Sequence, residues 1–245
     1  MFSPLSQFDI ISVISIFIKG YDFSISNMVL TVGFFLLVFI VILNIIKIDI
    51  RLIPKSWQFF FELIFLFVYR LIYLQIGSSG LIYFPFLLSL FLFILFLNLI
   101  SLLPYSFAVT SQFVWTLYFS LSICLGVFFV GIRKYKIKFL KIFLPEVPLL
   151  LYPLMVLIEL ASYVIRSFSL AIRLSANIMA GHILVHILAL TCFSLSSFQV
   201  DLSVLVYLLL FSLFVLEFGV ACLQAYVFTL LICMYLNDAL NLPEH

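Results

Sequence analysis

The chain has 245 residues, of which 67% are hydrophobic and only 9% are charged, and its net charge is +2. An ordinary soluble domain carries about 25% charged residues, so this composition excludes a soluble globular protein and indicates an integral membrane protein built from helices packed in lipid. The few Lys and Arg residues cannot form the basic polar surface that nucleic-acid binding requires, so we expect no nucleic-acid partner. The four cysteines lie inside apolar runs without a CxxC pair, which favours small core residues over disulfides or metal ligands.

The first elements in chain order are a spanning helix and a surface helix. Residues 28–46 contain no charge over 19 residues, close to the roughly 20 that cross a bilayer. The basic residues of 47–55 follow, which predicts that this end faces the inner side of the membrane. Residues 54–76 carry Glu62 and Arg70 on one helical stripe with apolar side chains opposite, so we expect an amphipathic helix on the inner surface.

The middle of the chain predicts a pair of spanning helices. Residues 71–132 contain no formal charge, which leaves room for spans at 80–102 and 112–132. Between them, Pro, Ser and Thr residues gather in 101–112 and indicate a turn. The basic run 133–141 follows the second span, so the two basic clusters of the chain agree on one topology with both of them inside.

Two long apolar segments, 147–190 and 202–238, complete the chain, and Asp201 with its Ser-rich neighbours is expected to form the turn between them. As one continuous helix, the 44 residues of the first segment would extend about 66 Å, twice the thickness of the hydrocarbon layer. Two upright spans or one strongly tilted helix would both fit this length, and hydropathy does not choose between them.

Polar and ionisable side chains recur along both long segments, where lipid penalises them. In chain order they are Glu159, Arg166, Arg173, Asn177, His182, His186, Glu217, Gln224 and Asp238. Arg173 lies in the middle of an apolar run, far from both ends, which disfavours an arginine that merely extends to the membrane surface. Asn177 lies one helical turn beyond it on nearly the same face, and His182 falls roughly opposite. The alternative for the amide side chains of Asn177 and Gln224 is that they only form polar contacts between packed helices.

Four stretches of the chain resemble subunit a of the F-type ATP synthases, the static membrane subunit that leads protons to the rotor ring. Residues 169–182, SLAIRLSANIMAGH, resemble the arginine signature of that family. The block QAYVFTLL at 224–231, followed by YLND at 235–238, matches the end of the same family. SPLSQFD at 3–9 and LPYSF at 103–107 resemble its mitochondrial members, whereas the Pro145–Pro148 turn is one residue shorter than in relatives.

The resemblance implies an all-α integral membrane protein in which upright spanning helices accompany a long, strongly tilted two-helix hairpin packed against a rotor ring. It implies a proton-conducting stator subunit with two offset half-channels, separated by the essential Arg173, which acts on the carboxylates of the rotor ring (subunit c). Asn177 and Gln224 would flank this arginine. Arg166 and His186 are weaker candidates, since the first can lie near the surface and the second can simply pack.

The remaining ionisable residues are divided by the resemblance between two proton routes. His182 with Glu217, helped by Asp238, would form the route that opens to the outer side, and Glu159 would belong to the route toward the matrix. Imidazole titrates near neutral pH and is therefore suited to relaying protons beside a carboxylate.

The resemblance also implies a location and a set of partners. We expect a multi-pass protein of the mitochondrial inner membrane with its basic loops toward the matrix. Its partners would be the rotor ring, the peripheral stalk, other membrane subunits of the ATP synthase, the lipid bilayer and H⁺. No GxxxxGK[ST] phosphate loop is present, so we expect no active site in this chain, no cofactor and no metal, and ATP chemistry in partner chains.

The alternative is a haem- or copper-binding subunit of a respiratory redox complex, because His182 and His186 could offer ligands from one helix face. Such a subunit would usually supply further histidines from other helices, and the only other histidine is His245. A purely structural scaffold would leave the polar stripe of Arg173 and Asn177 unexplained.

Overall fold

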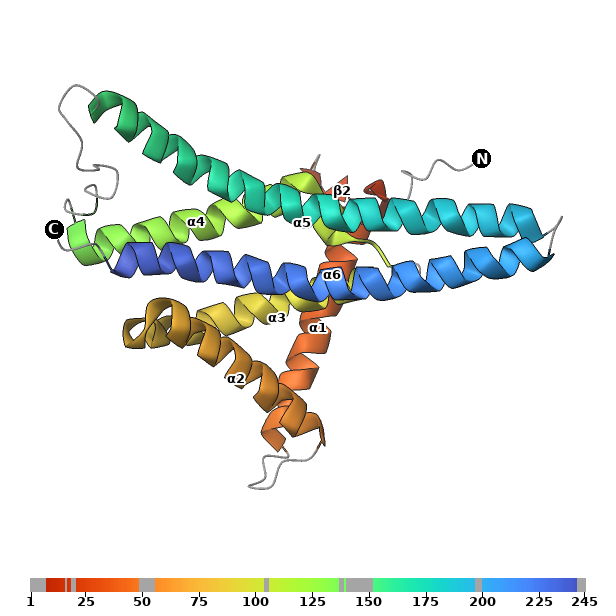
Figure 1. The fold of residues 1–245 in the computed structure, drawn as a ribbon, viewed down its shortest axis with the longest axis horizontal. Helices are drawn as coiled ribbons and strands as arrows, with labels where there is room; N and C mark the ends of the chain where they lie inside the picture. The colour runs from red at the N-terminus through yellow and green to blue at the C-terminus, as the bar shows by residue number, and fades with distance from the viewer. Residues whose placement is uncertain are drawn as a thin grey trace. The chain divides into compact units, whose positions relative to one another are not determined.

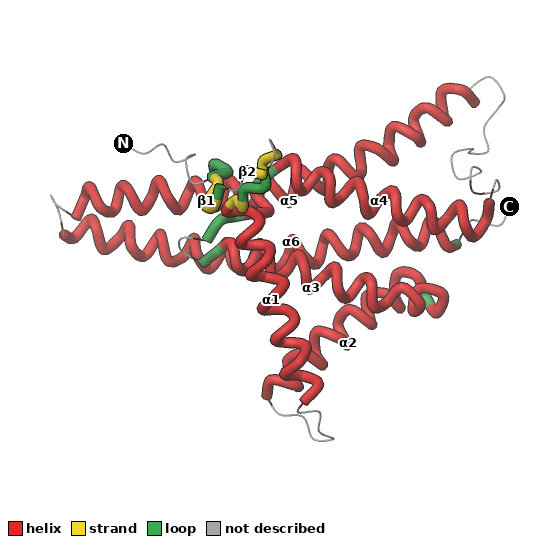
Figure 2. The backbone as a smooth tube through the Cα atoms, turned by 180° about the vertical axis from the view of Figure 1, so that it is seen from behind, coloured by secondary structure: helices red, strands yellow, loops and turns green. Residues whose placement is uncertain are grey.

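The computed structural model describes residues 8–15, 17–18, 21–48, 56–103, 106–136, 139, 152–196 and 200–241. Helix dominates these residues, as Figure 2 shows by colour. Lipid offers no hydrogen-bond partners to the backbone, and a helix satisfies its own N–H and C=O groups, so the apolar runs of this sequence fold as helices. The predicted all-α class of integral membrane protein is therefore confirmed.

Four short strands precede the first helix and were not predicted from the sequence. They are β1 (Ser12–Ile14), β2 (Phe17–Ile18), β3 (Tyr21–Asp22) and β4 (Ile25–Ser26). β1 pairs with β4 and β2 pairs with β3, both antiparallel. With two or three residues each, the strands are too short to leave a periodic pattern, so only local backbone pairing defines them.

The helices follow in chain order (Figure 1). They are α1 (Asn27–Ile48), α2 (Ser56–Ile76), η2 (Ser78–Tyr83), α3 (Phe84–Ser101), η3 (Val109–Ser111), α4 (Phe113–Tyr135), α5 (Tyr152–Ser196) and α6 (Val200–Leu240). The chain divides into two compact units that share α3, α5 and α6. The first unit comprises Met1–Leu52, Phe93–Phe113 and Leu174–Ala225, and the second comprises Ile53–Leu92, Val114–Arg173 and Tyr226–His245.

The core of the first unit joins α1 to the end of α3 and to α6. Phe35 of α1 is buried and meets the ring of Phe93 edge to face, with ring centroids 5.1 Å apart. Asn98 of α3 is also buried, and its side-chain amide donates a hydrogen bond to the carbonyl of Ala221 on α6, at 3.4 Å. At the start of α1, the N–H of Met28 donates to the side-chain oxygen of Asn27, so this side chain satisfies a backbone donor at the helix N-terminus.

The core of the second unit is tied together by hydroxyl groups that donate to backbone carbonyls. Ser120 of α4 donates to the carbonyl of Ser167 on α5 at 3.1 Å, and Tyr163 of α5 donates to the carbonyl of Cys124 at 3.1 Å. The hydrogen bonds of Ser120 and Tyr163 satisfy polar groups inside an otherwise apolar core.

Between α2 and η2, Gly77 has φ +82, a left-handed conformation that glycine adopts without strain.

Each of the two long segments forms one continuous helix. α5 has 45 residues and α6 has 41, so their lengths are about 68 and 62 Å. Helix α5 has no break between Tyr152 and Ser196, which favours the single long helix of the two alternatives that hydropathy left open. The Ser-rich flanks of Asp201 led us to expect this residue in the connecting turn. In the structure α6 begins at Val200, so Asp201 lies inside the first turn of the helix. The Pro145–Pro148 turn lies outside the described residues.

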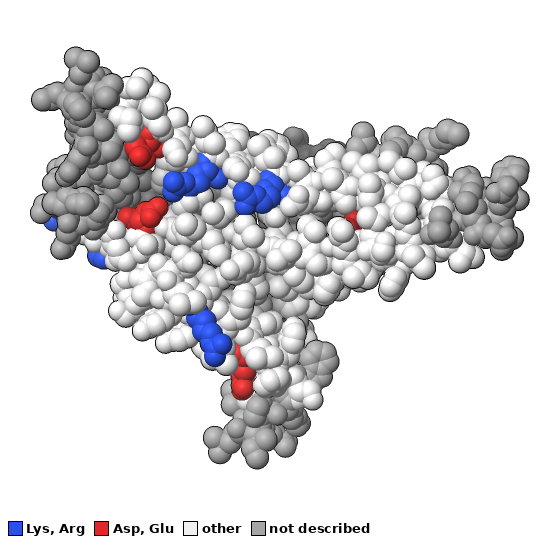
Figure 3. Space-filling model, in the orientation of Figure 1, with Lys and Arg blue, Asp and Glu red and all other residues white. Residues whose placement is uncertain are grey.

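Five helical stretches of the described residues are long and apolar enough to cross a membrane. They are Gln58–Ile76, Ser78–Ser101, Phe113–Tyr135, Leu154–Phe193 and Val206–Leu240. Figure 3 shows that the face drawn there is largely uncharged, with basic and acidic side chains in small separate groups. This composition is that of a multi-pass membrane protein. α2 is among these stretches, so its location on the inner surface, which the polar stripe of Lys55, Gln58, Glu62 and Arg70 predicts, stays a prediction.

Candidate functional site

Two polar clusters join α5 to α6, one in each unit, and the first begins at the arginine signature. Arg173 and Asn177 are exposed on α5, four residues apart on one face. The amide of Asn177 donates to the side-chain oxygen of Gln224 on α6 at 3.1 Å, and Gln224 is buried. Neither amide titrates, so this pair can hold a polar neighbour in place without itself gaining or losing a proton.

His182 and Glu217 line the same cavity of the first unit, which has a volume of about 280 Å³. Asn177 also lines it, and most of the remaining wall is apolar, with Leu102 and Leu216 among its residues. Nε2 of His182 and Oε1 of Glu217 are buried and lack a hydrogen-bond partner among the described residues. Buried polar atoms are nearly always hydrogen-bonded, so this pair of titratable groups is adapted to an occupant of the cavity such as water. We name these residues the cavity cluster: Asn177, His182, Glu217 and Gln224.

Gly181 belongs to the same cavity and was missed as a site residue in the sequence analysis. A Cβ atom at this position would overlap Oε1 of Glu217, so the carboxyl group lies directly against the backbone of α5. The aromatic ring of Phe8 meets His182 on another side, with ring centroids 6.3 Å apart. His186 does not line the cavity, although it follows His182 by one turn.

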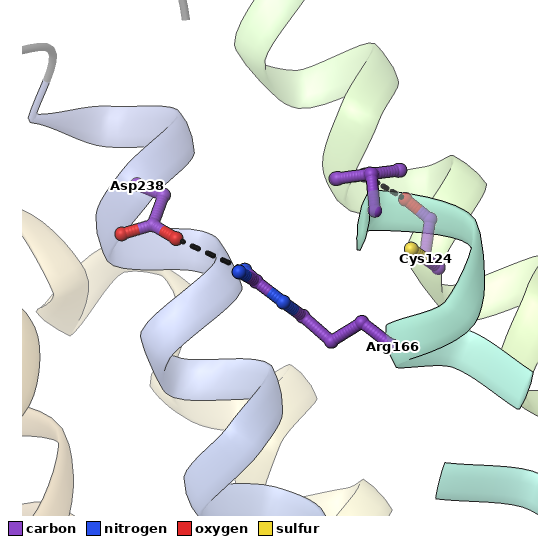
Figure 4. Close-up of polar contacts among 4 residues, drawn as sticks. Cys124, Arg166 and Asp238 are labelled. Carbon is purple, nitrogen blue, oxygen red and sulfur yellow. Dashed lines mark hydrogen bonds and ion pairs between the residues drawn. The ribbon is translucent and has the colours of Figure 1, made fainter. Parts of the chain in front are cut away.

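The second cluster consists of Arg166 on α5 with Asp238 and Tyr235 on α6. The guanidinium of Arg166 extends toward Asp238 (Figure 4) and forms an ion pair with it at 3.5 Å. The two side chains are 42% and 57% exposed. The guanidinium also lies over the ring of Tyr235 at 5.0 Å, a cation–π contact that fixes the arginine from a second direction. We name these three residues the ion-pair cluster.

Comparison with known proteins agrees with the resemblance seen in the sequence. A family model described as ATP synthase A chain matches residues 25–237. The chain belongs to the ATP synthase subunit a family. Proteins named ATP synthase subunit a are 46% identical in Marchantia polymorpha, 41% in Chondrus crispus and 38% in Dictyostelium discoideum. Each alignment covers 98 or 99% of this chain and at least 96% of the relative. These relatives are named as subunits of ATP synthases, and the described helices of this chain are those of a multi-pass membrane protein.

The ion-pair cluster includes Asp238, which the resemblance placed with His182 and Glu217 on the outer route. In the structure the side chain of Asp238 contacts Arg166. Arg166, a weaker candidate in the sequence, thereby gains a defined acidic partner.

Glu159 and Arg173 have no hydrogen bond or ion pair within the described part of the chain. Glu159 is partly buried on α5, seven residues or about 10 Å before Arg166. Among the described residues, no group of three or more His, Cys, Asp and Glu side chains could hold a metal ion.

Proposed function

We propose that the chain is the proton-conducting stator subunit of a mitochondrial F-type ATP synthase, with Arg173 as the barrier between two offset half-channels. The observation that carries the proposal is the cavity cluster, in which two unpartnered titratable atoms face one cavity beside the Asn177–Gln224 amide pair. A proton route requires titratable groups that water can reach, and this cavity provides a histidine and a carboxylate together.

The two routes would lie on opposite sides of the arginine along α5. His182 follows Arg173 by nine residues, or about 14 Å, whereas Glu159 precedes it by fourteen residues, or about 21 Å. We assign His182 and Glu217 to the outer route and Glu159 to the route toward the matrix. The Arg166–Asp238 pair lies on the same side of Arg173 along α5 as Glu159, and we propose that it positions α5 against α6 there.

Arg173 would act on the carboxyl groups of the rotor ring. A carboxylate about 4 Å from a guanidinium gains roughly 4 kcal/mol at an effective dielectric constant near 20, which is enough to drive off its proton as it arrives. Guanidinium does not deprotonate in proteins, so Arg173 cannot pass the proton across and the two routes remain separate. A membrane potential of 100 mV then supplies about 2.3 kcal/mol for each proton, which the offset routes convert into rotation.

The lengths of α5 and α6 support a strongly tilted hairpin against the ring. Each helix is about twice as long as the hydrocarbon layer is thick, so an upright helix would extend far beyond it. We place the chain in the mitochondrial inner membrane with the basic clusters 47–55 and 133–141 toward the matrix. Single-cysteine labelling should then place Ser106 and Lys136 on opposite sides, and labelling of both from one side would contradict this orientation.

The decisive experiment replaces Arg173 in the assembled complex. Arg173→Lys should abolish proton-driven ATP synthesis, because a poorly hydrated ammonium can lose its proton whereas guanidinium does not. Arg173→Ala should also raise passive proton permeability, because it removes the barrier. The measurements are ATP synthesis and proton uptake in vesicles, with assembly checked by subunit content. Normal synthesis in the Lys variant would refute the mechanism, and an unchanged permeability in the Ala variant would refute the barrier.

A further inference from the structure

A second cavity, of about 360 Å³, lies in the second unit and is lined by none of the residues proposed above for the proton routes. Its α2 side is one helix face that repeats every three or four residues from Leu63 to Gln75, a rise of about 18 Å. Tyr226 and Leu230 of α6 form the opposite side. We name this cavity the α2 groove. Its walls are chiefly Leu, Phe and Tyr side chains, so it suits an elongated apolar ligand.

Of the described residues that line the α2 groove, Arg70 alone is charged. Its side chain is exposed and makes no ion pair or hydrogen bond within the described residues. Glu62, an acid on the same helix, lies eight residues away, or about 12 Å along the axis, and its carboxylate accepts a hydrogen bond from Gln58 at 2.8 Å. An arginine on an apolar surface in a membrane protein is costly unless an anion accompanies it. Within the described residues, no acidic side chain therefore accompanies Arg70, and a ligand of this groove should carry a negative charge as well as an apolar part.

We propose that the α2 groove binds one anionic phospholipid. The phosphate accepts hydrogen bonds from the guanidinium of Arg70, whose planar fork matches two phosphate oxygens. An acyl chain follows Leu63, Leu66 and Phe67 along α2 and shields their exposed surface from water. This ligand supplies both the apolar length and the single negative charge that the groove lacks, and the membrane supplies it at high concentration.

The polar groups near Arg70 fit the rest of such a lipid. Gln75 lies five residues beyond Arg70, about 140° around α2, and lines the groove as Tyr226 of α6 does. Their amide and hydroxyl groups can donate to the ester oxygens of the glycerol backbone. Leu74, which is 81% exposed, also lines the groove and would be covered by the same molecule. A helix of a partner subunit would have to present a carboxylate at Arg70 to satisfy the same groove.

The test uses the intact complex in phosphatidylcholine vesicles that contain a small fraction of a photoactivatable lipid. One preparation carries the phosphatidylglycerol probe and the other carries the phosphatidylcholine probe, each with the reactive group on the acyl chain. Labelling of residues 63–75 is measured by mass spectrometry of peptides. We expect the anionic probe to label this stretch about fivefold more than the zwitterionic probe, the factor that one arginine contributes to binding an anionic lipid.

Two variants of Arg70 and one matched control decide the result. Arg70→Gln should bring the ratio of the two probes close to one, and Arg70→Lys should keep part of the preference because it keeps the charge. Arg133→Gln removes an equally exposed arginine at the end of α4, outside the groove, and should leave the ratio unchanged. Equal labelling by both probes in the unaltered complex, or an equal loss in Arg133→Gln, would overturn the proposal. Cross-linking of 63–75 to a partner subunit in place of lipid would also overturn it. None of these measurements depends on proton conduction.

Discussion

The two polar clusters on α5 and α6 use the same kinds of side chain in opposite ways. In the ion-pair cluster, Arg166 and Asp238 neutralise each other and remain largely exposed. In the cavity cluster, His182 and Glu217 face one cavity, and the buried atoms Nε2 and Oε1 have no partner among the described residues. A satisfied pair stabilises an arrangement of helices, whereas unsatisfied titratable groups keep their capacity to exchange protons. We therefore propose that the cavity cluster transfers protons and that the ion-pair cluster mainly positions α5 against α6.

The first and largest test of this comparison concerns His182 and Glu217. Glu217→Gln and His182→Gln should each lower proton-driven ATP synthesis about 100-fold, the scale on which positioned acid–base groups act, while the shape of each side chain is roughly kept. If the two groups relay one proton, the double variant should lose much less than the product of the two single losses. The measurement is proton uptake and ATP synthesis in vesicles that contain the assembled complex.

A control for this cycle is Ser212→Ala, since Ser212 is exposed on α6 and its hydroxyl donates only within its own helix turn. This variant should keep normal rates. Losses that multiply independently in the double variant would show that His182 and Glu217 do not form one unit.

The second test concerns the backbone against which the Glu217 carboxyl lies. Gly181→Ala inserts a methyl group where Oε1 of Glu217 now lies, and overpacking of this kind typically costs about 1–3 kcal/mol. Displacement of the carboxyl should lower proton uptake about tenfold while the complex still assembles. Gly219→Ala is a matched control two residues from Glu217, because a Cβ at that position meets nothing within 4 Å. It should keep normal uptake.

A second substitution should partly restore proton uptake in Gly181→Ala. Glu217→Asp shortens the side chain by one methylene and should make the added methyl group of Gly181→Ala tolerable, so the double variant should exceed Gly181→Ala in uptake. Equal losses in Gly181→Ala and Gly219→Ala would indicate a general effect of alanine in these helices and not a contact with the carboxyl.

The sequence was sufficient to predict the helical class from its apolar runs and the family from its motifs. It also identified the candidate polar residues, because charges in long apolar runs are visible without a structure. The sequence did not predict the contact between Asp238 and Arg166. The resemblance placed Asp238 with His182 and Glu217, and the spacing of residues along one helix does not say which side chain each of them meets on another helix.

Gly181 and the four short strands had no comparable signal. A glycine within a helix is compatible with free space or with a close approach, and only the position of Glu217 on the neighbouring helix distinguishes them. The strands are held by a few local backbone bonds, together with the 3.1 Å hydrogen bond from the N–H of Asn27 to the carbonyl of Ile11. Two-residue strands leave no alternation that a sequence pattern could reveal.

The smallest expected effect concerns the ion-pair cluster. Exposed ion pairs contribute at most about 1 kcal/mol, so Asp238→Asn and Arg166→Gln should each lower ATP synthesis by less than about fivefold. Arg166→Lys keeps the charge but loses the planar stacking on Tyr235, so its rate of ATP synthesis should lie between those of Arg166→Gln and the unaltered chain. The measurement is the same vesicle assay at two salt concentrations. If the pair only holds α5 and α6 together, the loss of ATP synthesis should depend on salt, whereas loss of a proton relay should lower proton flow at either salt concentration. If Asp238→Asn instead lowered synthesis as much as Glu217→Gln, both clusters would transfer protons, and the division between a transferring and a positioning cluster would be wrong.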